Sequence, residues 1–320
     1  ALIVLAVKKH THKITSSWIT AKELPGFISY ALIALVILPL LPDQSIQISH
    51  IPFLQTFLNG YGVELGAFAN VEIFNPRKIW FIIALVTGID VLGYVLGKVV
   101  GTKKSFTLAS LIGGFISSTS TTVALAQKSK TGHTNVLVGA AVLANVASFF
   151  QVFLLVGPLN SQWLVALTPT LLSIVGAGGI TAAYFLVRSH GKDTKEAKTE
   201  ASQERRIFDF IPALKFACLL IAVKFVTKLC LIMFGNSGFI ISSAIASFAG
   251  IDAIVLNLAD MAGRTISYST AILTFCLVNA TNLLTKAGYA FAQGSRAFAW
   301  RFLASAGVII AASLVGLVMM

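Results

Sequence analysis

Apolar runs of about 20 residues recur along this chain, and this is the length that a helix needs to cross a lipid bilayer. We count nine full spans, at residues 25–42, 79–101, 105–127, 135–157, 163–188, 209–234, 238–261, 268–290 and 299–319. Only 11% of the residues are charged, so lipid must solvate much of the surface. The sequence therefore predicts an all-α, polytopic integral membrane helix bundle.

Two parts of the chain resemble each other. Residues 112–126 align with residues 245–259 without a gap, which places Phe115 opposite Phe248. The comparison also pairs polar residues inside the predicted spans: Thr119 with Asp252, Asn145 with Asn279, and Ser148 with Asn282. Each copy holds four predicted spans, and an even number of crossings returns a chain to its starting side. The pattern therefore predicts two parallel four-helix repeats.

Prolines, polar loops and a charged stretch divide the sequence into five parts. We expect the tail of a preceding membrane domain plus one connecting span at 1–43, an extramembrane or interfacial loop at 44–73, repeat one at 74–188, a charged linker at 189–208 and repeat two at 209–320. No basic stretch precedes the apolar residues 1–7, so we interpret them as the end of a span, not as a cleavable signal.

The net charge of +12 does not indicate a nucleic-acid partner. The basic residues lie in short loops and at span ends, where lysine and arginine contact lipid headgroups. The lipid bilayer is the partner that this pattern predicts. The chain carries neither a His-Glu-x-x-His nor a Gly-x-Ser-x-Gly motif, so we rank an enzyme last, and we predict no cofactor.

Six consecutive hydroxyl residues, Ser117 to Thr122, follow the pair Gly113-Gly114. A helix can hide one or two such hydroxyls by bonding them to the carbonyl four residues back. Six in a row cover every face of a helix, so we expect part of the run to meet a polar cavity or a break in the helix. Close packing of helices through small residues is the alternative.

Two acids, Asp90 and Asp252, lie near the middle of predicted spans, where an unpaired carboxylate costs roughly 2.5–3.5 kcal/mol. Lys224 and Lys228 share one helix face and are the predicted charge partners of these acids. Asn279, Asn282 and Lys286 recur at helical spacing on another face. The candidate substrate- or ion-binding residues are Ser118, Thr119, Thr121, Thr122, Asn145, Asp252, Asn279 and Asn282.

These residues leave the ligand open. Hydroxyl, amide and carboxylate oxygens are the ligands that a hard cation prefers, with Asp252 supplying the charge. If a lysine reaches Asp252, the centre would instead suit a neutral or anionic solute, or the two would form a structural ion pair.

Several motifs resemble a known family. The segments are Thr20–Leu24, Ala34–Asp43, the Asn-Pro-Arg-Lys run within Phe74–Trp80, and the glycine-hydroxyl run Gly113–Leu125. Together they resemble the uncharacterised multi-span domain that follows the MgtC/SapB domain in long bacterial membrane proteins. The MgtC/SapB domain itself is represented by residues 1–14 at most. The resemblance implies a bacterial inner-membrane protein with a link to magnesium homeostasis, and it supplies no binding residues.

Two functions remain in view. The repeat, the hydroxyl run and the mid-span acids favour a membrane transporter or permease for a small ion or solute. The alternative is a non-transporting membrane regulator or scaffold that acts through helix-helix contacts. The sequence leaves the substrate, the metal if any, and a homo-oligomeric state open.

Overall fold

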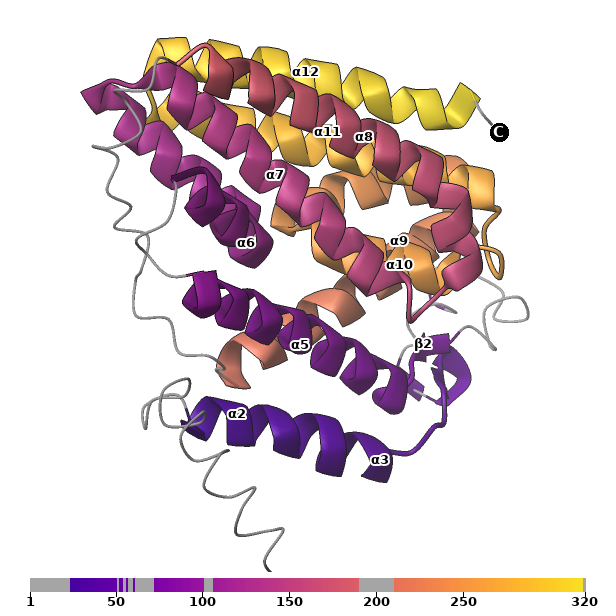
Figure 1. Ribbon diagram of the computed structural model, residues 1–320. Coiled ribbons are helices and arrows are strands. Elements are labelled where there is room, and N and C mark those ends of the chain that lie inside the picture. Colours follow the sequence, from indigo (N-terminus) through magenta and orange to yellow (C-terminus); the bar gives the residue numbers. More distant parts are fainter. Residues whose placement is uncertain are drawn as a thin grey trace, which may run out of the picture.

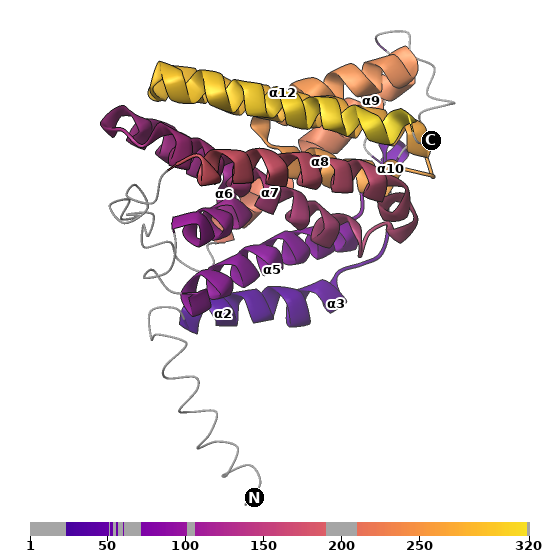
Figure 2. The same cartoon turned by 45° about the horizontal axis from the view of Figure 1, so that its top comes forward.

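The computed structural model describes residues 24–50, 52, 53, 56, 60, 72–100, 106–189 and 210–318. Nearly all of them lie in helices (Figures 1 and 2). Residues 1–23 of the predicted 1–43 part, most of the 44–73 loop and nearly all of the charged linker fall outside these residues. Within the loop, β1 (Ile46–Gln47) and β2 (Glu72–Phe74) form a small antiparallel ladder, which the all-helical prediction did not include.

Within the described ranges, the bundle is built from eight longer helices. They are α5 (Pro76–Val100), α6 (Phe106–Lys128), α7 (Thr134–Val156), α8 (Ser161–Val187), α9 (Phe210–Ala246), α10 (Ile251–Met261), α11 (Tyr268–Gln293) and α12 (Arg296–Val318). The segment before them is helical from Leu24 to Leu40, as α2 (Leu24–Ala31), the π-helical η1 (Leu32–Ile37) and α3 (Leu38–Leu40). The described residues also form three 3-10 turns, which are η2 (Ile48–His50), η3 (Ser129–Thr131) and η4 (Ser247–Ala249).

Six of the described helices, α5 to α9 and α12, contain a segment long and apolar enough to cross a membrane. The prediction of a membrane helix bundle is thereby confirmed in its general form. The segment Leu24–Leu40 is apolar but shorter, and α11 is not among the six. Six such segments do not reproduce the predicted nine.

Side chains at the helix starts fix where several helices begin. Asn75 precedes Pro76 and accepts a hydrogen bond from the Lys78 backbone N–H at 3.1 Å, so it caps α5 in front of a proline that needs no N–H partner. Asn160 caps α8 in the same way through the Trp163 N–H. Its amide also donates to the carbonyls of Ala259 and Ala262, which ties the start of α8 to the end of α10.

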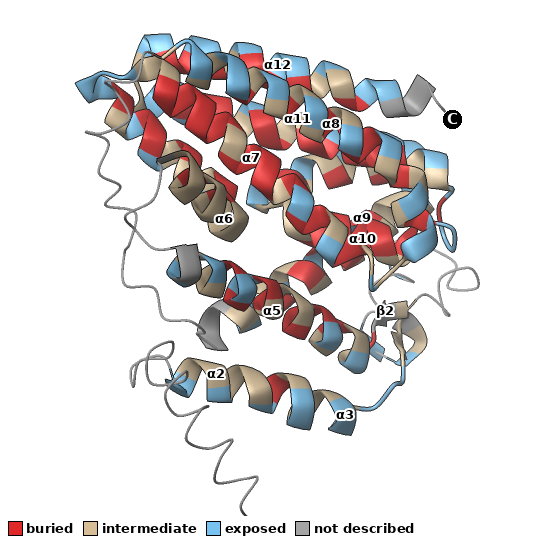
Figure 3. Cartoon of the chain, in the orientation of Figure 1, coloured by how far each residue is buried: buried red, intermediate tan, exposed pale blue. Residues whose placement is uncertain are grey.

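Helix α7 forms the centre of the bundle. Sixteen of its residues are buried, and it contacts α6, α8, α10 and α12 (Figure 3). The closest approach is to α6, where a Cβ on Gly114 would lie 2.2–2.5 Å from backbone atoms of Ala144. Only glycine fits there, because any side chain would separate the two helices.

Helix α6 does not run straight through the bundle. Its backbone leaves the helical region at Ser117, with φ −163° and ψ 98°. A Cβ on Gly113 would lie 2.8 Å from the Thr121 hydroxyl, although eight helical residues span about 12 Å. The two arms of α6, residues 106–116 and 118–128, must therefore fold back into a hairpin, which Figure 1 also shows. The predicted span at 105–127 is among the six segments by length and apolarity, but its two arms do not form one continuous crossing.

Helix α9 also reverses direction, at Gly235. This glycine has φ 63°. A Cβ on Gly238, after the reversal, would lie 2.5 Å from the Cys230 carbonyl oxygen and 2.5 Å from the Phe234 Cβ, which both come before it. The chain breaks again at Gly250, which has φ 147° and separates η4 from α10. The predicted span at 238–261 is therefore two short helical pieces.

The helices that the sequence comparison pairs run in opposite directions. The end of α11 meets the end of α6 through a hydrogen bond between Gln293 and Gln127, beside the start of α7. The start of α11 instead meets the start of α8 through Tyr268 and Gln162. Helix α11 is thus antiparallel to α7, and the predicted parallel arrangement is wrong. Because α6 folds back, the first unit crosses the bundle an odd number of times.

Candidate functional site

The ammonium group of Lys286 lies in the middle of the bundle. This side chain is 1% exposed and comes from α11. Its Nζ donates to the Ser118 hydroxyl at 2.9 Å and to the Asn145 side-chain oxygen at 2.7 Å. Three helices, α6, α7 and α11, therefore meet at one buried positive group. We use the name polar centre for Lys286 together with Ser118, Thr122, Asn145, Asp252 and Asn279.

The break in α6 brings its hydroxyls to this centre. Ser117 caps the second arm, because its Oγ accepts from the Ser120 backbone N–H at 3.3 Å. Ser118 follows directly and reaches Lys286. One turn later, the Thr122 hydroxyl donates to the Ser118 carbonyl at 2.7 Å and accepts from the Asn145 amide at 3.2 Å. The hydroxyl run thus contains a helix break, as the sequence predicted, and Ser118 directly after the break contacts the lysine.

Asp252 approaches from another break. It lies in the first turn of α10, after Gly250, and is half-buried. Asp252 and Lys286 interact electrostatically, although no ion pair within 4 Å joins them among the described residues. The sequence comparison that pairs Ile112 with Ile245 also pairs Ser117 with Gly250. Each break is therefore followed by a residue that interacts with Lys286: Ser118 through a hydrogen bond, and Asp252 electrostatically at longer range.

The amides of the predicted stripe have different surroundings. Asn145 is 1% exposed and uses its amide group on Thr122 and on the Ala141 carbonyl. Asn279, its predicted counterpart, is fully buried, and both its side-chain nitrogen and oxygen lack a partner among the described residues. The position paired with Thr122 is Val255, which offers no hydroxyl. Asn279 is therefore a buried amide with open hydrogen-bonding capacity.

The remaining predicted residues lie in three places. Thr119 and Thr121 are half-buried near the tip of the α6 hairpin, with Thr121 against Gly113 of the opposite arm. Asn282 is 9% exposed and precedes Lys286 by one turn on α11. Asp90 lies outside this centre, exposed on α5.

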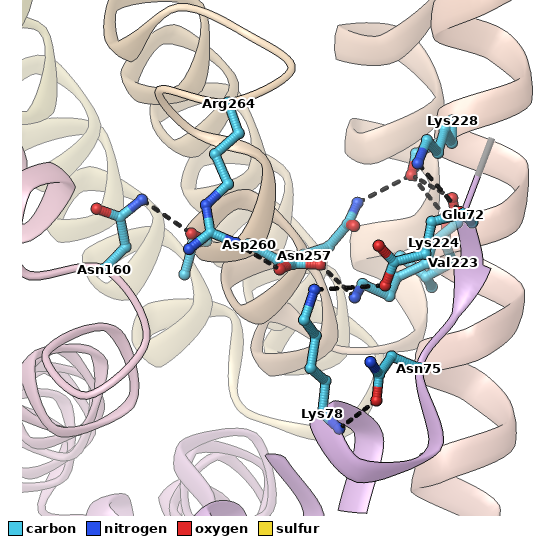
Figure 4. A network of polar contacts seen from close by, with 12 residues as sticks. Glu72, Asn75, Lys78, Asn160, Val223, Lys224, Lys228, Asn257, Asp260 and Arg264 are labelled. Atoms are coloured by element: carbon cyan, nitrogen blue, oxygen red, sulfur yellow. Dashed lines mark hydrogen bonds and ion pairs between the residues drawn. The ribbon is translucent and has the colours of Figure 1, made fainter. Parts of the chain in front are cut away.

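The predicted partners Lys224 and Lys228 belong to a second network (Figure 4). Lys224 forms an ion pair with Asp260 at the end of α10, and Arg264 lies 3.9 Å from the same carboxylate. Lys228 donates to the backbone carbonyl of Glu72 at 3.0 Å. The contacts found for these two lysines are thus with Asp260 and Glu72, and their predicted pairing with Asp252 or Asp90 stays a prediction. Helical spacing fixed the face that these lysines share, but not the helix that they meet.

Sequence reasoning left Lys286 out of the candidate site. The signal was present, because Lys286 continues the helical stripe of Asn279 and Asn282 inside an apolar segment. Within the described residues, no group of three His, Cys, Asp or Glu side chains is arranged to hold a metal ion. The centre instead offers one ammonium, one carboxylate, hydroxyls and amides, which can hold a small polar or charged ligand.

Comparison with known proteins gives one match. A family model described as "Domain of unknown function (DUF4010)" matches residues 84–294, which include every residue of the polar centre. No curated protein and no solved structure matches the chain.

Proposed function

Because the chain belongs to the DUF4010 family, whose description states no activity, we propose its function from the polar centre: a membrane permease for a small ion or solute. The observation that carries this proposal is a lysine that is 1% exposed where two broken helices converge. Ionisable groups at this depth are costly to bury and generally mark substrate or ion pathways. Broken helices with exposed termini are a recurrent way to build such a binding site.

An inverted repeat is part of the proposal. The shift in numbering that pairs Asn145 with Asn279 also pairs Thr134, the first residue of α7, with Tyr268, the first residue of α11. The same shift carries Pro76, where α5 begins, to Phe210, where α9 begins. Each unit would then have three crossing helices and one broken segment, in opposite orientations. Two such units can alternate in exposing a shared centre to the two sides.

The resemblance to MgtC/SapB proteins adds magnesium homeostasis and the bacterial inner membrane as context, so Mg²⁺ belongs among the solutes to be tested. The alternative function is a non-transporting regulator or scaffold. The close contact of Gly114 with Ala144 favours it, since the helices there form a tightly packed unit. Transport separates the two functions.

The test is flux through liposomes that contain the purified protein, against a panel of inorganic ions, including Mg²⁺, and small organic solutes. We expect flux of at least one solute above that of empty liposomes. Thr122→Val should reduce this flux, because it removes a hydroxyl from the polar centre. Thr181→Val is the matched control, since the Thr181 hydroxyl bonds only within α8, to the Ala177 carbonyl. Flux no faster than in empty liposomes for every solute would refute the permease and favour the regulator.

A further inference from the structure

Lys286 places a buried positive charge in the polar centre, where its hydrogen-bond acceptors are neutral oxygens. Lys286 donates to two neutral oxygens, whereas an ammonium group has three N–H donors. No third acceptor for Lys286 is seen in the part of the chain that the structure describes. One donor of a buried cation is therefore available to a ligand.

Two helix N-termini also lie at the centre. The second arm of α6 begins at Ser118, in contact with Lys286, and α10 begins at Ile251, beside Asp252. The first α6 arm and η4 end at the same two breaks, so the opposite partial charges of their C-termini largely cancel those of the N-termini. The ammonium of Lys286 is therefore the positive group that a ligand would meet, and no ion pair within 4 Å joins it to Asp252 among the described residues.

Asp252 is the group that could reverse this conclusion by attracting a cation. Its place in the first turn of α10 opposes that use, because a carboxylate there already compensates the helix terminus. A cation entering the centre would meet the ammonium of Lys286 at close range.

We propose that the polar centre binds a small monovalent anion, held by the ammonium of Lys286 between the starts of the second α6 arm and of α10. This inference rests on the proposed function only in taking the polar centre as the binding site. The buried amide of Asn279 lies about two turns before Lys286 on the same helix and has no partner among the described residues. An anion that reaches both groups must carry more than one oxygen, so small oxyanions and carboxylates are favoured over halides.

The experiment measures binding in detergent, independently of transport. The unfolding midpoint of the purified full chain is followed in sodium nitrate, formate or chloride, at constant ionic strength against sodium gluconate. Nitrate or formate should raise the midpoint in a saturable manner. Lys286→Met should weaken the apparent affinity by about 30-fold or more, as expected for the loss of a buried charge partner. Lys286→Arg should retain most of the binding.

Asp252→Asn gives the opposite sign and does not depend on the folding of the lysine variant. Removal of this negative charge should tighten nitrate or formate binding. The inference is overturned if none of the three anions stabilises the protein, or if Asp252→Asn weakens their binding. It is also overturned if Na⁺, K⁺ or Mg²⁺ stabilises the protein and Asp252→Asn abolishes that effect. Anion binding without any flux would instead refute the permease and leave the anion site standing.

Discussion

The two asparagines that the sequence comparison pairs should respond in opposite ways to the same substitution. Asn145 makes three hydrogen bonds, to Thr122, to the Ala141 carbonyl and to the charged Lys286. Asn279 makes none among the described residues, although it is fully buried. Leucine has the same branched shape as asparagine and no polar atoms, so Asn145→Leu and Asn279→Leu form a matched pair.

The expected magnitudes follow from these contacts. A hydrogen bond to a charged group contributes roughly 1.5–3 kcal/mol and a neutral one roughly 0.5–1.5 kcal/mol, with smaller values for neutral bonds inside membranes. Asn145→Leu should therefore destabilise the protein by about 2–4 kcal/mol. Asn279→Leu removes two buried polar atoms without partners, so the free energy of unfolding should stay the same or rise. Any packing cost of the larger leucine is common to both variants.

The assay is thermal unfolding in detergent, read from the fraction of folded protein in size-exclusion profiles. Asn145→Leu should lower the midpoint by roughly 4–8 °C, taking about 2 °C per kcal/mol for a chain of this size. Asn279→Leu should leave the midpoint unchanged or higher and still reduce solute flux, because Asn279 belongs to the proposed binding site. Equal destabilisation by both variants would refute the assignment of these hydrogen bonds.

Three further results are expected. Lys224→Met should destabilise the protein by about 2–3 kcal/mol, less than the 3–5 kcal/mol typical of a fully buried pair because the Asp260 side chain is 23% exposed. The double variant with Asp260→Asn should recover most of this loss in the same unfolding assay, and no recovery would contradict the pair. Gly114→Ala should destabilise the protein by about 1–3 kcal/mol, because it forces α6 away from α7. Gly288→Ala, where a Cβ would have nothing within 4 Å, should be neutral or stabilising by up to about 1 kcal/mol. Equal unfolding midpoints for the two variants would refute the close contact of α6 with α7. Two single-cysteine variants without the native cysteines, Ser161→Cys at the start of α8 and Ala297→Cys at the start of α12, test the orientation of the two units. They should react with an impermeant thiol reagent from opposite sides of the liposome membrane. Reaction of both from the same side would favour parallel repeats.

Part of this structure could be predicted from the residues. The glycine pair followed by six hydroxyls indicated a helix break, because these residues weaken the helix and offer its backbone other partners, and the break occurs at Ser117. The comparison of the two copies pairs that residue with Gly250, where the second break occurs. Local composition carries this information, so local reasoning could recover it.

The direction of the chain after each break could not be predicted. The 23 residues of α6 have the length and apolarity of a straight span, and only the angles at Ser117 turn them into a hairpin. This one residue changes the number of crossings from even to odd and reverses the expected orientation of the units. Helix partners were equally hidden, since spacing places Lys224 and Lys286 on a face but does not say which helix that face meets.

The central claim is that a solute reaches the polar centre, and the reactivity of a cysteine at Thr122 tests it most directly. Thr122 and Ala140 are both 0% exposed, but only Thr122 belongs to the polar centre. Thr122→Cys and Ala140→Cys are made without the native Cys218, Cys230 and Cys276, and each is exposed in liposomes to a small water-soluble thiol reagent. We expect Thr122→Cys to react at least tenfold faster than Ala140→Cys, and nitrate or formate to slow only the reaction of Thr122→Cys. Equally slow reaction at both positions, unaffected by anions, would contradict it.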